Sequence, residues 1–581
     1  MDRKTTISMT TDFVPNSFFN NLSLPANDIS KLSFCGSSKT AKVKSWVDGL
    51  RATQIAQTSA ILYRTVPELT RLKTDPETRF EMLEAVRPSV QHCIQGLTKE
   101  FLNQPVVLPD NAQKAAIVAQ ALQKYMVDGY VTCVRDIVTK SRQNARALDI
   151  LTKSVHRSIT GIGLVFLRNF QLYTPTPRGL WLLIHSLHRT GCYYELEKKP
   201  VADAIFDLDT ASSIDNSYVK VLLMATAGCS QINQKDVDTL FKAVSIWSSL
   251  VKLNKHIPQD GENLFIVNQS QDAPPGYKKR FTGSEFDYVL EMDIRSLIAQ
   301  LNKQGGNTGD IIATKGKSGL IKDFPESLLT HLLEVWVNVA ERKQHRKNTR
   351  AVADICIGLV DCHYFISDLT SFDSFISQNS EASDWQSDIG RNFSTDLSRD
   401  KYGIGTTGPE RPSFRVTVQN ASSGGFCLLW QGEIPARIEA GEIVGLKEAG
   451  KRSWSVGVVR WIRQMKKASQ LGIQMLSDLP KTCGAAQIYD MGGYSDYMRA
   501  IVLPPFKMSN LGTTLLTAKA PFQEMSKAKL MNGQKITTIK LDKCIFSTGS
   551  IKQFSFHSLD AINPSRDESN KRGSSFDSWD D

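Results

Sequence analysis

The chain has 581 residues, of which 41% are apolar and 22% are charged. This length exceeds what one hydrophobic core holds, so about two to four domains are expected, and the composition is that of a globular protein. The formal net charge of +11 favours anionic partners, but it is smaller than the dense basic stripe of a dedicated duplex-binding protein.

The N-terminal stretch MDRKTTISMTTDFVPNSFF lacks the apolar region of a secretory signal. No apolar run reaches the roughly 18–20 residues that a membrane-spanning helix needs, so no membrane span is expected. The ten cysteines are scattered singly, without a CxxC pair, and most lie inside apolar runs. This usage predicts reduced, buried thiols in a cytoplasmic protein.

Residues 1–40 are rich in Ser, Thr and Asn and predict a mostly irregular leader. Residues 41–335 predict a multi-helix module. In DPETRFEMLEAVRPSVQHCIQGL, Asp75 is suited to the N-cap and Pro76 to the first helical position. Apolar residues then recur at helical spacing, at Phe80, Leu83, Val86 and Val90. Between about 255 and 325 the pattern is mixed, because NLFIVNQS predicts a strand and KQGGNTGDIIATKGKSG a loop.

After Arg350 the period changes to that of strands. Within residues 336–483, six β-branched and aromatic runs predict a small closed antiparallel barrel: AVADICIGLVDCHYFIS, FRVTVQN, GFCLLW, EIVGLKEA, SWSVGVVRWIRQM and LGIQMLS. The polar stretch at about 371–410 is expected to be a loop inserted into this barrel.

Residues 484–560 carry a second set of strand-like runs, and residues 561–581 form a polar tail that is expected to be disordered. The runs are RAIVLPPF, TTLLTA, KITTIKLDKCIF and QFSF. The predicted fold class is therefore multidomain α + β: an N-terminal multi-helix module, an antiparallel β-barrel and a small C-terminal β segment.

No motif in the chain predicts an enzyme or a metal site. A phosphate-binding loop requires GxxxxGK[ST], and although Gly316, Lys317 and Ser318 fit its end, the position of the first glycine is occupied by Ile311. The chain contains no HExxH, CxxC or GxSxG pattern. We therefore expect no catalytic residues and no cofactor.

The densest positive charge is ERKQHRKNTR, residues 341–350, where helix gives way to strand. Arg342, Arg346 and Arg350 are four residues apart, which on a helical turn places them on one side. A solvated basic helix end would show the same pattern. The stretch Val416 to Trp430, VTVQNASSGGFCLLW, is the second notable pattern, because a hairpin manages with two turn residues and here a longer polar segment, NASSGG, separates two apolar runs.

Read together, Arg346-Lys-Asn-Thr-Arg350 and Asn420-Ala-Ser422-Ser-Gly-Gly425 resemble the RxxxR and [D/N]xSxxG motifs of the PilZ domain. The runs VGLK, WSVGVVRWIRQ and LGIQML are similar to the barrel strands of that family. The resemblance covers about 336–483 and implies a PilZ-type barrel that binds the bacterial second messenger cyclic di-GMP. GLWLLIHSLHR and SYVKVLLMATAG look similar to stretches of the helical region of large PilZ proteins, a less specific likeness.

The chemistry of these residue types fits that ligand, which carries two phosphates and two guanines. Arginine offers a planar fork for phosphate oxygens or for guanine O6 and N7, an asparagine amide can bond to a guanine edge, and glycines permit positive φ and close approach to the backbone. The predicted ligand-binding residues are Arg346, Arg350, Asn420, Ser422 and Gly425, with Arg342 and Gly424 as further candidates. A glycine-containing turn in which Asn and Ser satisfy the backbone remains the alternative.

Three features depart from the family pattern. Seventy residues separate Arg350 from Asn420 (420 − 350), a gap that the inserted loop would explain. The first position of the second motif is Asn where many members have Asp. Two other RxxxR registers lie near these motifs, Arg342 to Arg346 and Arg411 to Arg415; the latter is ranked lower because Arg415 falls in the strand leading into NASSGG.

The expected function is that of a cytoplasmic cyclic di-GMP effector that contacts an unidentified protein partner through its helical module. The resemblance implies output to motility, pilus or surface-attachment machinery. One alternative is a PilZ-fold adaptor that no longer binds nucleotide. Another is a nucleic-acid-binding protein that uses the basic surplus, although no DNA partner is expected.

Overall fold

The computed structural model describes residues 13–140, 144–205, 207–256, 265–281, 288–304, 310–312, 320–322, 324–337, 347–379, 411–422, 424–432, 434–465, 468–505 and 511–559. The chain divides into two compact units. The first comprises Met1–Val352, Val416–Glu442 and Val458–Gln474, and the second Ala353–Arg415, Ile443–Gly457 and Met475–Asp581.

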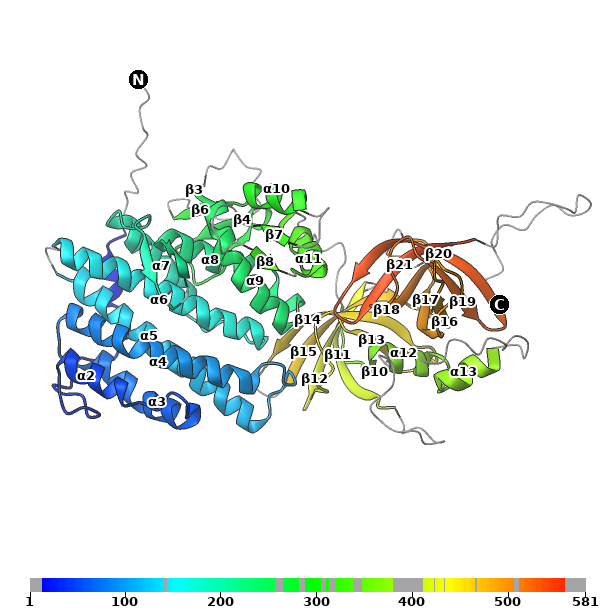
Figure 1. Cartoon of the computed structure of the whole chain (residues 1–581), viewed down its shortest axis with the longest axis horizontal. Coiled ribbons are helices and arrows are strands. Elements are labelled where there is room, and N and C mark those ends of the chain that lie inside the picture. Colours follow the sequence, from blue (N-terminus) through cyan, green and yellow to red (C-terminus); the bar gives the residue numbers. More distant parts are fainter. Residues whose placement is uncertain are drawn as a thin grey trace, which may run out of the picture. The chain divides into compact units, whose positions relative to one another are not determined.

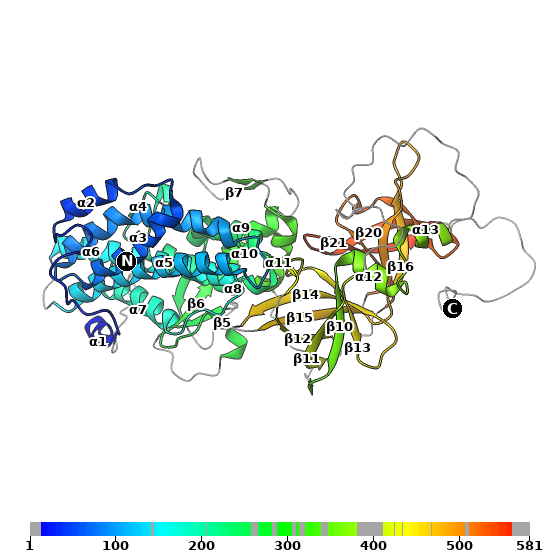
Figure 2. The ribbon, with the colours of Figure 1, turned by 90° about the horizontal axis from the view of Figure 1, so that it is seen from below.

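The helical module lies in the first unit, and its long helices α4, α5 and α6 lie side by side (Figures 1 and 2). Its helices are α1 (Pro15–Asn20), α2 (Thr40–Asp48), α3 (Ile55–Arg71), α4 (Pro76–Phe101), α5 (Asp110–Val138), α6 (Ala145–Gln171), α7 (Leu180–Tyr193), α8 (Ile214–Thr226), α9 (Gln234–Trp247), α10 (Arg295–Gln304) and α11 (Glu326–Val337). The predicted start of α4 is confirmed, because the Asp75 side chain accepts a hydrogen bond from the Thr78 N–H at 2.9 Å. The expected leader contains one short helix, α1, whose Phe19 is buried. Among the described residues, no helix is both long and apolar enough to cross a membrane.

Short antiparallel strands occur within this module: β1 (Val201–Asp203) with β2 (Asp207–Ser212), then β3 (Lys252–Lys255), β4 (Phe265–Asn268), β5 (Gly276–Tyr277) and β6 (Val289–Asp293) in the order β3-β6-β4-β5, and β7 (Asp310–Ile312) with β8 (Leu320–Lys322). The strand predicted in NLFIVNQS is confirmed as β4. The expectation of a loop over KQGGNTGDIIATKGKSG is wrong at Ile311, which lies in β7, whereas Gly316, Lys317 and Ser318 fall outside the described residues.

The expected PilZ-type barrel is present, and its strands follow the order β10-β13-β14-β15-β12-β11, with a further β10–β11 pairing and β9 added beside β11. The strands are β9 (Lys347–Asn348), β10 (Val352–Ile357), β11 (Phe414–Ser422), β12 (Gly425–Gln431), β13 (Ile443–Glu448), β14 (Ser455–Gln464) and β15 (Ala468–Ser477).

One predicted strand of this barrel is wrong in its second half. AVADICIGLVDCHYFIS forms β10 only as far as Ile357, and a helix, α12 (Gly358–Ile366), follows. Gly358 has φ +87°, a left-handed conformation that ends the strand. Leu359, Cys362, Phe365 and Ile366, which recur at helical spacing, then pack into one buried cluster. Part of the expected inserted loop is also helical, as α13 (Phe372–Asn379), and residues 380–410 lie outside the described residues.

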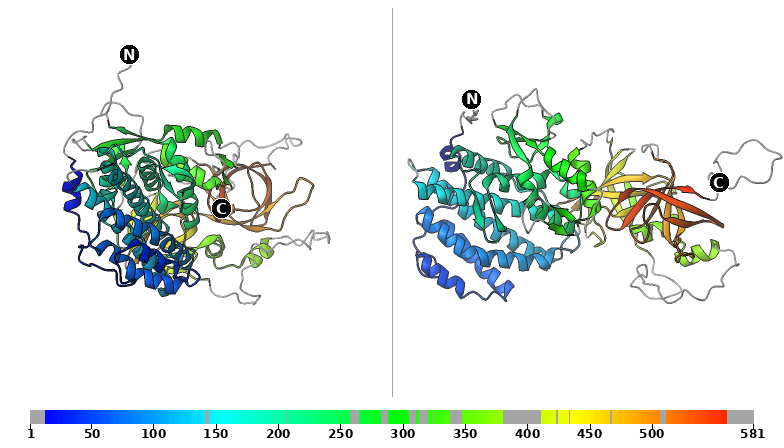
Figure 3. Two further views of the ribbon diagram at one scale, coloured as in Figure 1. Left: turned by 60° about the vertical axis from the view of Figure 1, so that its left-hand side comes forward. Right: turned by 45° about the horizontal axis from the view of Figure 1, so that its top comes forward.

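The predicted C-terminal β segment forms a closed barrel, with strands in the order β16-β17-β18-β21-β20-β19 (Figure 3). They are β16 (Lys481–Gln487), β17 (Met498–Leu503), β18 (Thr514–Ala518), β19 (Lys527–Asn532), β20 (Lys535–Ser547) and β21 (Ile551–Ser558). The interior is filled by apolar side chains that include Val502, Leu515, Leu530 and Phe554. The tail predicted at 561–581 lies outside the described residues.

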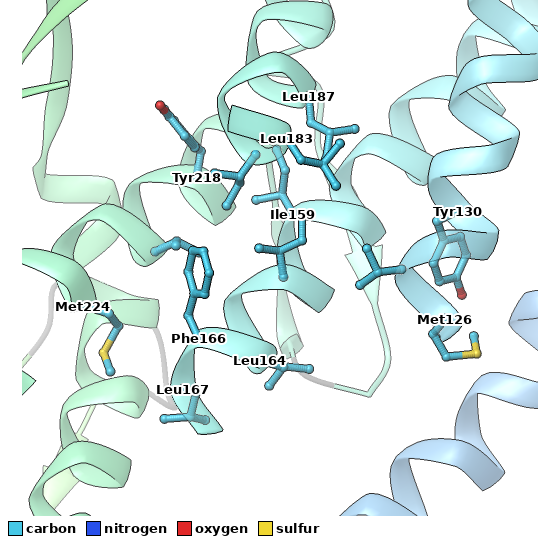
Figure 4. Packing of buried hydrophobic residues seen from close by; sticks show 14 of the residues in the cluster. Met126, Tyr130, Ile159, Leu164, Phe166, Leu167, Leu183, Leu187, Tyr218 and Met224 are labelled. Atoms are coloured by element: carbon cyan, nitrogen blue, oxygen red, sulfur yellow. The ribbon is translucent and has the colours of Figure 1, made fainter. Parts of the chain in front are cut away.

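The largest core belongs to the helical module, where Phe166, Leu183, Leu187 and Tyr218 meet between helices (Figure 4). Two helices approach closely at Gly129, where an added Cβ would lie 2.6 Å from Leu83 Cδ2. Seven of the ten cysteines are buried and none forms a disulfide, which agrees with the expectation of reduced, buried thiols. Packing this close is typical of a rigid protein interior.

Candidate ligand-binding site

The segment that carries Arg350 runs antiparallel beside the strand that carries Asn420. In the β9–β11 pairing, Asn348 lies opposite Asn420 and Lys347 opposite Ala421. The pairing continues through the Thr349 N–H, which donates to the Gln419 carbonyl at 3.0 Å, and the Val418 N–H, which donates to the Ala351 carbonyl at 2.8 Å. Because paired strands lie about 4.8 Å apart, the backbones of the two predicted motifs are direct neighbours.

Only part of the first motif lies within the described residues. Arg350 is described and exposed to solvent. Arg342 and Arg346 lie outside the described residues, but Arg346 is covalently bonded to Lys347, the residue opposite Ala421. The structure therefore brings the Arg350 segment to the second motif, and the two other arginines remain predictions from the sequence.

The sequence suggested a long polar gap at the second motif, but most of this segment belongs to strands. β11 extends through Ser422 and β12 begins at Gly425, so only two residues of the sequence separate the strands. Asn420 and Ser422 are strand residues, and Ser422 lies opposite Gly425 in the register. The Ser422 hydroxyl donates to the Gly425 carbonyl at 3.2 Å, which is the structural role that a hairpin-closing serine can have without a ligand.

Gly425 is required by a neighbouring strand rather than by positive φ. An added Cβ would lie 2.1 Å from the carbonyl oxygen of Ile473 on β15, and no left-handed φ is found at this residue. The expectation that Gly425 supplies positive φ is therefore wrong. The missing side chain lets β15 approach β12 closely.

Asn420 has the least explained side chain of the motif. Its Oδ1 is buried, and no donor among the described residues bonds to it. Buried acceptors are nearly always paired in folded proteins, and an unpaired one costs roughly 1–3 kcal/mol. This oxygen is thus suited to accept a hydrogen bond from a ligand amino group or from an arginine.

Two further polar residues lie beside the motif and were not among the predicted site residues. Gln474 on β15 is paired opposite Gly425, and the Nε of Arg460 on β14 donates to Gln474 Oε1. Burial lowers the pKa of Arg460 from its usual value, an effect that the charge of Glu334 on α11 opposes. Both residues stand in the sequence runs VVRW and GIQM, so the signal was present, but the position of Gln474 opposite Gly425 follows from the β12–β15 register.

The competing arginines are occupied elsewhere. Arg411 forms an ion pair with the buried carboxylate of Asp361 at 2.9 Å, and Arg415 lies 3.3 Å from Asp354. Both pairs belong to the second unit. Their carboxylate partners support the lower rank given to the Arg411 to Arg415 register.

Among its described residues, the helical module contains one cluster of potential metal-ligating atoms, at His188, Cys192 and Asp215, which lie within 4.8 Å of one another. His188 Nε2 lies 2.9 Å from Asp215 Oδ1, and Gln269 Nε2 lies 3.0 Å from His188 Nδ1. Both ring nitrogens are thus hydrogen-bonded within the protein, and the His188 ring stacks on Tyr218. The cluster is accounted for as a polar link between α7 and α8.

Comparison with known families assigns the chain to one class of protein. The model of a middle PilZ domain, described as that of the cyclic-di-GMP receptor FimW, matches residues 264–402 and 399–481. The models of the FimW N-terminal domain and the FimW C-terminal beta-barrel domain match residues 41–259 and 483–559. The chain therefore belongs to the PilZ domain family, in the large form with a helical N-terminal region, as the sequence predicted.

A curated relative covers nearly the whole chain. The cyclic-di-GMP receptor FimW of Pseudomonas aeruginosa (strain PAO1) is 28% identical over 584 residues, which span 94% of this chain and 95% of that protein. No solved structure gives a significant match. The domain boundaries predicted at 40, 335, 483 and 560 remain predictions beside the ranges that the family models match.

Proposed function

We propose that the chain is a receptor for cyclic di-GMP and acts as a signalling effector rather than as an enzyme. The observation that carries the proposal is the pairing of β9 with β11, because it joins the segment of Arg350 to Asn420 and Ser422. Support also comes from the matching PilZ model and from a relative whose name describes a cyclic-di-GMP receptor.

In the proposed complex, Arg346 and Arg350 pair with phosphate oxygens or guanine edges of the ligand. The Asn420 side chain, whose Oδ1 has no donor among the described residues, receives a guanine N–H. Gln474 lies opposite Gly425, and Arg460 donates a hydrogen bond to Gln474; both are proposed to border the ligand. Arg342 and Gly424 are further contacts proposed from the sequence alone.

The proposed output is a change in the helical module. Helix α11 ends at Val337, ten residues before β9 begins at Lys347, and its Glu334 interacts electrostatically with Arg460 beside the site. Binding of the ligand by the arginine segment would act on this helix directly. We propose that a protein partner in the cytoplasm reads this change and that the output serves motility, pilus or attachment functions.

Calorimetry of the full chain with cyclic di-GMP tests the proposal. Replacement of Arg350 or Arg346 by Glu should weaken binding about 10- to 100-fold, because a charge-assisted hydrogen bond contributes about 1.5–3 kcal/mol. Arg415→Glu is the matched control, since Arg415 is exposed and pairs with Asp354. Unchanged affinity in both motif variants would refute the assignment of the site.

The adaptor that binds no nucleotide remains a second candidate, and one observation favours it. The Ser422–Gly425 hydrogen bond and the contact of Gly425 with Ile473 are both explained by hairpin packing alone. A wild-type chain that gives no heat with cyclic di-GMP, and no rise in melting temperature, would select this candidate.

A further inference from the structure

The C-terminal barrel carries a hairpin with three exposed apolar side chains. Residues 488–497, here called the tip hairpin, connect β16 to β17 and project beyond the barrel wall (Figures 2 and 3). Met491 is 100% exposed, and Tyr489 and Tyr494 are each 48% exposed. Burial within the barrel does not account for these residue types at this position, because none of the three fills its core.

The tip hairpin is ordered. Ile488 and Tyr494 form a bridge, and the Gly492 N–H donates to the Tyr489 carbonyl at 3.0 Å. Gly492 and Gly493 have φ values of +93° and +83°, which close the turn without strain. A hairpin that is already ordered loses little conformational entropy when it binds to another surface.

Lysines surround the base of the tip hairpin. The Ile488 N–H donates to the Lys527 carbonyl at 2.9 Å, and Lys527 lies directly opposite Lys540 in the β19–β20 register. The Lys529 ammonium lies 3.9 Å from the centre of the Tyr494 ring. Like charges opposite each other destabilise a sheet, so an anionic surface would relieve the repulsion between Lys527 and Lys540.

The acidic groups nearby reduce this charge without cancelling it. Asp490 and Asp496 lie in the tip hairpin itself, and Asp542 pairs with His557, the neighbour of Lys540 on β21. Residues 483–559 contain nine lysines and arginines against four aspartates and glutamates, a surplus of five positive charges. Close to half of the net charge of +11 of the whole chain thus resides in this barrel.

We propose that the tip hairpin docks the C-terminal barrel on an anionic lipid surface, with Tyr489, Met491 and Tyr494 in the headgroup region and the lysines against lipid phosphates. Tyrosine prefers the interface between water and lipid, and lysines near an anionic leaflet strengthen binding. A convex tip enters a fluid interface without a complementary cavity, which favours lipid over a protein groove. The inference is independent of the proposed nucleotide site.

Vesicle flotation of the full chain tests the proposal. The chain should float with vesicles of phosphatidylcholine mixed with phosphatidylglycerol, and less with phosphatidylcholine alone. The double variant Tyr489→Ser, Met491→Ser should bind about tenfold more weakly, since binding scales with the inserted apolar area. The double variant Lys527→Glu, Lys540→Glu should lose the preference for anionic vesicles.

Ile536→Ser is the matched control, because Ile536 is 48% exposed in the β19–β20 hairpin at the other end of β19. It should float like the wild type, and all variants should melt within a few degrees of it, since none of the replaced side chains is buried. Failure of the wild-type chain to float with anionic vesicles would overturn the proposal. Equal flotation of the tip variant would also overturn it, as would hairpin-dependent binding to a protein without any binding to vesicles.

Discussion

The two β-barrels of this chain are built by similar antiparallel pairing but differ in what their surfaces offer. The C-terminal barrel is a closed ring of six strands around an apolar interior. The PilZ-type barrel adds a seventh, two-residue strand, β9, beside β11, and there it presents Asn420 and the Arg350 segment. We infer that in the PilZ-type barrel the added strand, rather than the barrel itself, brings the predicted nucleotide-binding residues together.

The largest expected effect tests the independence of the two barrels. Phe554→Ala removes a side chain with 0% exposure from the core of the C-terminal barrel and should lower the free energy of unfolding by about 3–5 kcal/mol. Cyclic di-GMP affinity below the melting transition should remain within about twofold of wild type, because this core contains none of the proposed site residues. Denaturant unfolding and calorimetry measure the two quantities, and a parallel loss of affinity would contradict the separation.

A pair of glycine substitutions, one in each barrel, compares how well the two barrels tolerate an added methyl group. In Gly425→Ala, the new Cβ meets the Ile473 carbonyl oxygen at 2.1 Å, so the PilZ-type barrel should lose about 1–3 kcal/mol of stability. In Gly484→Ala, the nearest atom is Cδ1 of Ile376, a flexible side-chain end at 2.9 Å, and the loss should be smaller. Equal losses, measured by denaturant unfolding of the two variants, would show that strand approach at Gly425 is adjustable.

A smaller effect depends on pH. His363 of α12 is buried and its Nε2 lies 3.3 Å from the Cys483 carbonyl; burial lowers its pKa from 6.5 to about 4. The unfolded chain therefore binds a proton between these two values, and stability falls as pH decreases through this window. Between pH 7 and pH 5 the loss should be about 2 kcal/mol, and His363→Gln should remove that part of the dependence. An unchanged pH profile in the variant would assign the loss to other groups.

The barrels also show what sequence patterns can and cannot predict. β17, β18 and β20 were visible because their runs are β-branched. β16 and β19 were not predicted, because KTCGAAQ and KAKLMN are rich in small residues and lysine, which are depleted in strands. These segments form strands through pairing with their neighbours. The helix α12 was not predicted because the apolar run after β10 fits both the strand period and the helix period. The strand ends at Gly358, whose left-handed conformation the sequence pattern does not reveal.

The candidate site was predicted in part for a similar reason. Its motif residues stand in the sequence, and the β9–β11 pairing brings Arg350 and Asn420 together. Position 425 requires glycine because of the carbonyl group of Ile473, which lies 48 residues away in the sequence (473 − 425). The contribution of Gln474 depends on strand register. Neither could be derived from local spacing, because spacing gives residue types and faces but not the partner strand.

A double-mutant cycle on Arg350 and Asn420 tests the central claim most directly, with cyclic di-GMP affinity measured by calorimetry on the full chain. Each alanine variant should weaken binding, and the double variant should depart from additivity by at least about 0.5 kcal/mol, because the two residues would contact one ligand. The cycle of Arg415→Ala with Asn420→Ala should be additive. Strictly additive losses in the first cycle, or affinity that neither substitution changes, would contradict a shared site.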